Sequence, residues 1–170
     1  MPPDKILEAA CNMLAEFQLK LWVQNLQNHQ RARTNPRVRW SPPDPNAVKV
    51  NFDGAMFKEL NEAGIEIVVR NQDGRVMAAI AKKIHHPPSV EILEFLAARR
   101  AVLFASELGF LQIIFEGDLE VTIRALQEGN SAISSVGHII KDIMSILGSF
   151  VTHTFSHVRR QGNTVAHVLA

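Results

Sequence analysis

Three acidic residues lie in short segments whose neighbours assign them to separate secondary-structure elements. They are Asp53 in Val-Asn-Phe-Asp-Gly, Glu94 in Glu-Phe-Leu-Ala-Ala, and Asp118 in Phe-Glu-Gly-Asp. Carboxylates that converge from separate elements can hold two hard divalent cations about 4 Å apart, and such a pair assists phosphodiester hydrolysis. The three acids, in the order strand, helix, strand, therefore predict a site for metal-dependent cleavage of a nucleic acid.

Each acid also has a structural explanation. Asp53 precedes a glycine, and Asp-Gly is a common turn sequence. Asp118 stands where a helix is expected to begin, which is the position of an N-cap. Glu94 is harder to explain in this way, because positions 97, 98, 101 and 105 on its side of the helix are all alanine and indicate close packing on a sheet. A carboxylate on such a face is costly unless a cation compensates it.

Hydrophobic periodicity predicts the elements that carry these acids. Alternating or continuous apolar runs predict five strands, at residues 48–52, 65–69, 76–81, 112–116 and 150–157. Helical spacing predicts four helices, at residues 89–108, 118–128, 136–147 and from 163 onward. The turn sequence Asn71-Gln-Asp-Gly74 joins the second and third strands in a hairpin. This order indicates an α/β fold with a mixed five-stranded sheet, first antiparallel and then parallel, flanked by helices.

The acidic motifs resemble those of the ribonuclease H family, and most closely the domains of plant proteins derived from retrotransposons. The likeness runs from about Val48 to Ala170. It implies a ribonuclease H-like fold and a metal-binding trio of Asp53, Glu94 and Asp118, with Mg2+ as the cofactor and Mn2+ as an alternative. The activity that it implies is endonucleolytic hydrolysis of the RNA strand of an RNA–DNA hybrid by two-metal catalysis, with recognition of the 2′-hydroxyls.

The chain departs from the family pattern at several positions. Active members carry a fourth acid after a pattern like Asn163-Thr-Val-Ala, and this chain has His167 there, a softer ligand that suits Mn2+ better than Mg2+. His167 is therefore a fourth candidate catalytic residue, as a weak ligand or in proton transfer, or else a residue that faces solvent. Glu66 stands where a glycine is common, Leu119 where a polar residue is frequent, and the connection 159–162 is short. These departures leave two alternatives open: an inactive domain that binds nucleic acid, and a structural remnant of a retroelement.

Charge limits how this chain can hold nucleic acid. The whole chain has 18 Lys and Arg against 17 Asp and Glu, and residues 47–170 are close to neutral. Binding must then depend on metal ions and on local basic patches, because a general positive field is absent. Candidates for contacts to the phosphate backbone are Lys82, Lys83, Arg159 and Arg160, although solvated surface charge explains each of them singly as well.

The composition fits one domain with an appendage, since 170 residues with 46% apolar content do not suffice for two full domains. We expect an amphipathic helix in residues 1–32 that packs on the domain or on another chain, and an Arg/Pro-rich linker in 33–46. Residues 47–170 form the ribonuclease H-like domain, whose final helix has only about two turns, as in a fragment or a truncated gene product. A single cysteine and the lack of a secretory signal or long apolar run predict a soluble, intracellular protein, in the nucleus or the cytoplasm.

Overall fold

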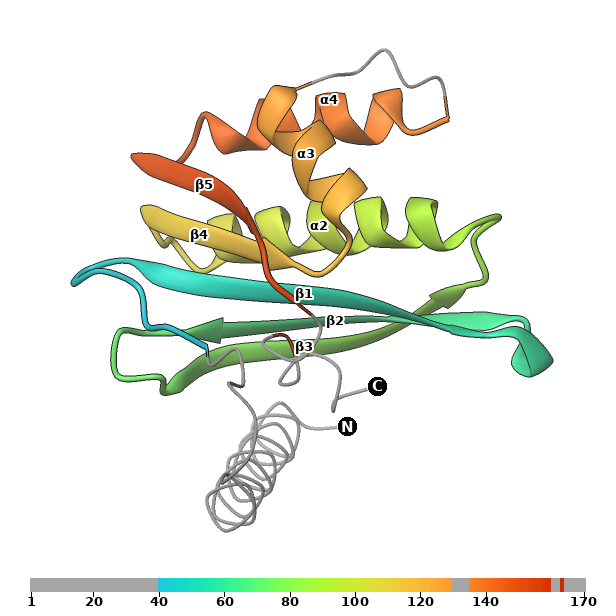
Figure 1. Cartoon of the computed structure of the whole chain (residues 1–170), viewed down its shortest axis with the longest axis horizontal. Coiled ribbons are helices and arrows are strands. Elements are labelled where there is room, and N and C mark those ends of the chain that lie inside the picture. Colours follow the sequence, from blue (N-terminus) through green and yellow to red (C-terminus); the bar gives the residue numbers. More distant parts are fainter. Residues whose placement is uncertain (1–39, 130–134, 160–162, 164–170) are drawn as a thin grey trace, which may run out of the picture. The chain divides into compact units, whose positions relative to one another are not determined.

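The computed structural model of the chain describes residues 40–129, 135–159 and 163 (Figure 1). The strands are β1 (Val48–Phe57), β2 (Glu62–Arg70), β3 (Val76–His85), β4 (Gln112–Gly117) and β5 (Thr152–His157). The helices are α2 (Val90–Glu107), α3 (Glu120–Glu128), α4 (Gly137–Leu147) and a 3-10 turn, η1 (Lys58–Leu60). The expected helices in 1–32 and after Asn163 lie outside the described residues. No helix in the described ranges is long and apolar enough to cross a membrane.

The five strands form one mixed sheet in the order β3-β2-β1-β4-β5. The first three strands pair antiparallel, whereas β4 pairs parallel with both β1 and β5. The hairpin between β2 and β3 is the predicted one: Asn71 Oδ1 accepts hydrogen bonds from the amides of Asp73 (3.0 Å) and Arg75 (2.9 Å), and Gly74 has a φ of +73°. The structure confirms the predicted mixed sheet, and it places β1 at the centre.

The central strand β1 is buried on both faces of the sheet. One face carries apolar side chains of the hydrophobic core: Val48, Val50 and Phe52. Alternate residues of a strand point to the opposite face. On β1 the residues of this opposite face are polar and buried. They are Lys49, Asn51 and Asp53, with exposed fractions of 7, 0 and 6% respectively. Because buried polar groups need partners, this second face of β1 must be compensated by residues from other elements.

Helix α2 packs on β1 and β2 through the small side chains that the sequence predicts. Its four alanines at positions 97, 98, 101 and 105 are all fully buried. The helix begins after Ser89, whose Oγ accepts a hydrogen bond from the amide of Ile92 at 3.2 Å, and it ends before Gly109, which has a φ of +73°. The alanine face lets the helix axis lie close to the sheet, so that Glu94 on the same helix reaches β1.

Two glycines next to the aspartates permit close packing at the centre of the sheet. A Cβ atom on Gly54 would lie 2.5 Å from Cγ of Leu93, and a Cβ atom on Gly117 would lie 2.7 Å from the Phe52 ring. Gly54 is therefore required for the approach of α2 and is not a turn residue. The turn explanation of Asp53-Gly54 is wrong, because Asp53 lies inside β1 and the strand continues to Phe57.

Two other local expectations are also corrected. The N-cap of α3 is Leu119, and its side chain makes no capping hydrogen bond, so Asp118 lies one position before the cap. The third strand, expected at residues 76–81, continues as β3 to His85. In both cases long-range pairing and packing determine the element boundary, which local sequence signals locate only approximately.

The packing at Gly117 generates a test of stability. Gly117→Ala should lower the free energy of unfolding by about 1–3 kcal/mol, because the added methyl overlaps the buried Phe52 ring. Gly148→Ala is a matched control, since Gly148 has a φ of −63° and the nearest atom to its added Cβ lies at 3.9 Å. Urea unfolding of both variants measures the difference. Equal stability of the two variants would contradict the close packing described for Gly117.

Candidate metal centre

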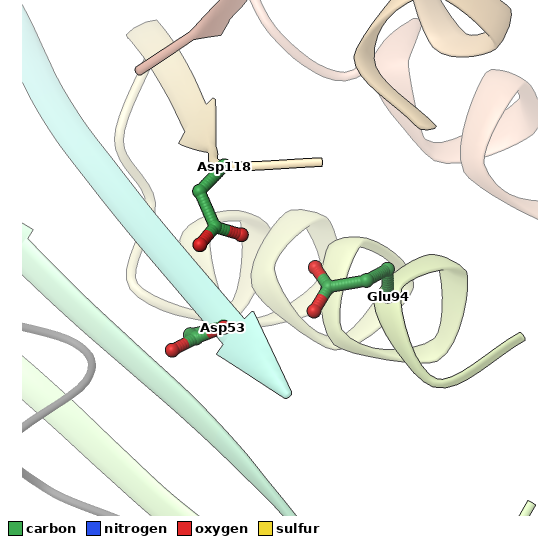
Figure 2. Close-up of side chains that lie close together, drawn as sticks. All are labelled: Asp53, Glu94 and Asp118. Atoms are coloured by element: carbon green, nitrogen blue, oxygen red, sulfur yellow. The ribbon is translucent and has the colours of Figure 1, made fainter. Parts of the chain in front are cut away.

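Three carboxylates from distant parts of the chain meet beside β1. Asp53, Glu94 and Asp118 each offer an oxygen atom, and these three atoms lie within 4.8 Å of one another. Figure 2 shows the side chains converging from β1, from α2 and from the residue that follows β4. The three acids that the sequence singles out are thus brought together in space.

The position at which β4 ends, and at which its pairing with β1 ends, explains how all three carboxylates reach the same point. The pairing of β4 with β1 runs from Val48 to Asn51, so Asp53 lies just beyond the last β1 residue that β4 covers. β4 ends at Gly117, and Asp118 follows directly. Glu94 then approaches from α2, one residue after Leu93, which contacts Gly54. The cluster therefore forms where β4 leaves the side of β1.

The three acids differ in burial and in their fixed contacts. Asp53 is 6% exposed and Glu94 is 3% exposed, whereas Asp118 is half-buried. Asp53 Oδ1 accepts a hydrogen bond from the Gly54 amide at 2.9 Å. The backbone carbonyl of Asp118 lies 3.0 Å from Nε2 of His157 on the neighbouring strand β5. Two acids are thus held on the rigid core, and the third stands at its edge, facing solvent in part.

A fourth carboxylate, Glu66 on β2, stands directly opposite Asp53 in the antiparallel β1–β2 pair. Glu66 is 3% exposed, and its Oε2 has no hydrogen-bond partner among the described residues. Burial, and then the charge of Asp53, raise the pKa of Glu66 from 4.5 to about 8. In the sequence, Glu66 is notable only because the family commonly has a glycine at this position. Its place beside Asp53 could not be seen there, because it depends on strand register.

The donor set fits a hard divalent cation. All the donors in the cluster of Asp53, Glu94 and Asp118 are carboxylate oxygens. Mg2+, Ca2+ and Mn2+ prefer such ligands, whereas zinc and copper sites in proteins usually include cysteine or histidine. Concentrated buried negative charge also favours a cation electrostatically. These residues therefore suit a hard divalent cation, the class to which the expected Mg2+ and Mn2+ belong.

A buried polar network occupies the rest of this face of the sheet. Nζ of Lys49 lies 2.6 Å from Oε1 of Glu116, and Asn51 Nδ2 donates to Oε2 of Glu116 at 3.0 Å. Arg70 Nη2 donates to Oδ1 of Asn51 at 2.7 Å, and Asn51 Nδ2 also lies 3.1 Å from Oδ1 of Asn163. The alternation of polar residues on β1 was the one signal in the sequence that pointed to this network.

Asn163 and Trp40 connect flanking segments to this network. Nδ2 of Asn163 donates to the backbone carbonyl of Phe52 at 3.0 Å, next to Asp53, and Asn163 is fully buried. The guanidinium of Arg70 lies 4.0 Å from the centre of the Trp40 ring. Burial lowers the pKa of Arg70 to about 10, and the charge of Glu116 opposes that shift, so Arg70 stays protonated at neutral pH. Trp40, from the segment expected to be a linker, thus covers a buried cation.

Three of the four candidates for nucleic-acid contacts lie within the described residues. Lys82 and Lys83 are successive residues of β3, so their side chains point to opposite faces of the sheet. Lys83 forms a 2.6 Å ion pair with Glu62, and Lys82 lines a hollow of about 270 Å³ together with Arg99 and Arg100 of α2. Arg159 is exposed after β5. Arg160 and His167 lie outside the described residues.

Comparison with known proteins gives one family and one fold. Residues 51–170 match the family described as reverse transcriptase-like. The comparison with curated proteins found no match. Among solved structures, ribonuclease H1 from the halophilic archaeon Halobacterium salinarum is similar over 73% of this chain and 94% of that chain, with 24% identity and a TM-score of 0.66.

Two further structures show the same likeness. The N-terminal ribonuclease H domain of a Mycobacterium tuberculosis protein, solved as a fusion with maltose-binding protein, has 20% identity and a TM-score of 0.65, over 73% of this chain and 90% of that chain. LC11-RNase H1 in complex with an RNA/DNA hybrid has 20% identity and a TM-score of 0.64, over 72% and 92%. At these identities the likeness establishes the fold.

The shifted pKa of Glu66 generates a test of stability against pH. The folded protein holds the Glu66 proton up to about pH 8, whereas the unfolded chain releases it near 4.5, so ionisation lowers stability as the pH rises between these values. Glu66→Gln should therefore stabilise the metal-free protein by on the order of 3 kcal/mol near neutral pH, and little near pH 4.5. Urea unfolding in EDTA over a pH series measures this. A stability difference that does not change with pH would contradict the raised pKa.

Proposed function

The chain belongs to the reverse transcriptase-like family and has the ribonuclease H fold, and from this premise we propose that it is a metal-dependent endonuclease that cleaves the RNA strand of RNA–DNA hybrids. The observation that carries the proposal is the cluster of Asp53, Glu94 and Asp118, with one oxygen from each within 4.8 Å of the others. Three acids from separate elements, buried or half-buried and gathered at one point, are difficult to explain as structural charges.

The substrate class is proposed from the neighbouring structures and from the fold. LC11-RNase H1 has been solved in complex with an RNA/DNA hybrid. So has the foamy viral protease-reverse transcriptase, of which 20% of the chain is similar in fold to this protein. The near-neutral charge of the chain argues against tight general binding to duplexes, so recognition would depend on the metal centre and on 2′-hydroxyl contacts. Arg159, which is exposed and follows the strand that pairs beside Gly117, is a candidate to contact the backbone near the cluster.

In this mechanism the protein holds its carboxylates, and the cations that they bind, in a fixed geometry. Divalent cations, when bound, supply Lewis acidity that activates the attacking water and stabilises the leaving oxygen. Asp53, Glu94 and Asp118 would hold them, and Asp53 and Glu94 are kept rigid by β1 and by the packed face of α2. The half-buried Asp118 leaves one side of the cluster open to a phosphate. Burial of the other two acids strengthens their electrostatic effect on the cations.

A second candidate function is hybrid binding without cleavage. It is favoured by His167, which stands where active relatives carry a fourth acid. The two functions differ in their dependence on metal. Binding through phosphate contacts weakens as salt rises, with or without Mg2+, whereas cleavage requires the metal. A filter-binding titration at several salt concentrations, run beside the cleavage assay, separates a binding domain from a nuclease and from a domain with neither activity.

The proposal predicts the outcome of a cleavage assay. The protein should release fragments from a hybrid labelled on the RNA strand in Mg2+ or Mn2+, and not in EDTA. Asp53→Asn should abolish this activity, because it removes a negative ligand while it preserves the size of the side chain. Asp73→Asn, in the exposed turn between β2 and β3, is the matched control and should cut as the parent does. Cleavage by Asp53→Asn at the parental rate would reveal a contaminating nuclease or a different site.

A separate prediction concerns His167. His167→Asp should raise the rate of cleavage in Mg2+, or create activity if the parent has none, because a carboxylate holds a hard cation better than an imidazole. The gain should be smaller in Mn2+, which accepts nitrogen ligands. His138→Asp, on the exposed side of α4, makes the same chemical change outside the site. If His167→Asp binds hybrid as the parent does but cuts no faster in either metal, the histidine is not what limits the enzyme.

A further inference from the structure

The proposed metal binding by Asp53, Glu94 and Asp118 does not explain the environment of Glu66. It is paired with Asp53 on one side and with Ala81 on the other, in the central part of the β2 ladders. Side chains directly opposite each other in an antiparallel pair have Cβ atoms about 4.5–5.5 Å apart, and like charges at this distance repel. The sheet thus places two carboxylates side by side, with an alanine as the only other cross-strand neighbour of Glu66.

The nearby cations of the protein do not compensate Glu66. Lys83, on the same face of β3, forms its ion pair with Glu62 at 2.6 Å. Lys49 and Arg70 are held in the polar network by Glu116 and Asn51. Among the described residues Glu66 forms no ion pair, and its Oε2 accepts no hydrogen bond although the residue is only 3% exposed. An ionised carboxylate that is buried without an ion pair is strongly unfavourable unless a bound cation compensates its charge.

The space beside Glu66 gives a ligand access. A hollow of about 400 Å³ is lined by residues of β2 and β3 that include Glu66, Gly64 and Ala81. Gly64 and Ala81 have little or no side chain, so the carboxylate stands beside open space. A hydrated cation fits such a volume. The charged residues that also line the hollow are Glu62, Lys82 and Lys83, and because Glu62 and Lys83 pair with each other, Glu66 is the carboxylate of this lining that has no ion pair among the described residues.

We propose that Glu66 is a further carboxylate ligand of the metal centre, which holds a divalent cation together with Asp53. Glu94 reaches Asp53 from α2, on the face of the sheet that carries Val50 and Phe52, whereas Glu66 lies on the opposite face. Asp53 then stands between two groups of acids and is shared by both. The inference rests on the proposed metal dependence of the protein, and it enlarges the site from three carboxylates to four.

Direct measurement of Mn2+ affinity tests this inference. Titration calorimetry or electron paramagnetic resonance of Mn2+ on the whole chain gives the affinity without any cleavage step. Glu66→Gln should weaken Mn2+ binding about tenfold or more, since even the loss of residues that only support metal ligands costs about 10–100-fold. Asp118→Asn should weaken it as well. Glu62→Gln, which removes a carboxylate four residues away on the same face of β2, should change it by less than about twofold, because its charge is already paired with Lys83.

A conservative variant separates ligation from simple charge. Glu66→Asp keeps the negative charge but shortens the side chain by one methylene, so a direct ligand loses its reach while a remote charge does not. Weakened binding in both Glu66 variants supports ligation. Parental affinity in Glu66→Asp or in Glu66→Gln overturns the inference. If Asp118→Asn alone weakens binding, the proposed function stands and only the role of Glu66 fails; if the parent binds no Mn2+, both fail. Circular dichroism of each variant verifies that the fold is retained.

Discussion

Repulsion between the carboxylates around Asp53 is the main electrostatic cost that this fold must offset. Asp53 meets Glu94 and Asp118 beside the end of β4, and Glu66 stands opposite it across the sheet. Buried like charges destabilise a fold, so their assembly requires stability from other contacts. The apolar face of β1 packed on α2 provides it, as do the aromatic contacts of Phe115 with its neighbours on β5 and the preceding loop.

The face of the sheet that carries Asp53 also contains two buried cationic side chains, Lys49 and Arg70, but these already have partners in the protein. Lys49 and Arg70 are bound to Glu116 and Asn51, and the Trp40 ring lies against the guanidinium. Protein cations thus neutralise one part of the face and leave the region around Asp53 acidic. An external divalent cation is the group that would complete such a region. The distribution of charge, more than the amount of charge, is what supports the proposed metal-dependent activity.

Most of the framework could be predicted from local signals. The Ser89 cap, the alanine face of α2 and the Asn71–Gly74 turn each act within a few residues, so their sequence patterns were sufficient. The local explanations that the structure excludes concern residues whose conformation depends on distant partners. Asp53-Gly54 has the composition of a turn, yet pairing of β1 with β2 continues through it to Phe57. Tertiary contacts override local preference in such places.

The choice of the three acids, and the placement of Asp53 on a strand and Glu94 on a helix, follow from residue type and from periods of two and 3.6 residues in the sequence. The positions of Glu66 opposite Asp53 and of Asn163 beside Asp53 depend instead on the tertiary fold. The reason is strand register. A shift of one residue between β1 and β2 would move every side chain of one strand to the other face. The register is set by the packing of the apolar faces of both strands and by the geometry of their connection, so it depends on both strands together and not on the residues around Glu66 alone.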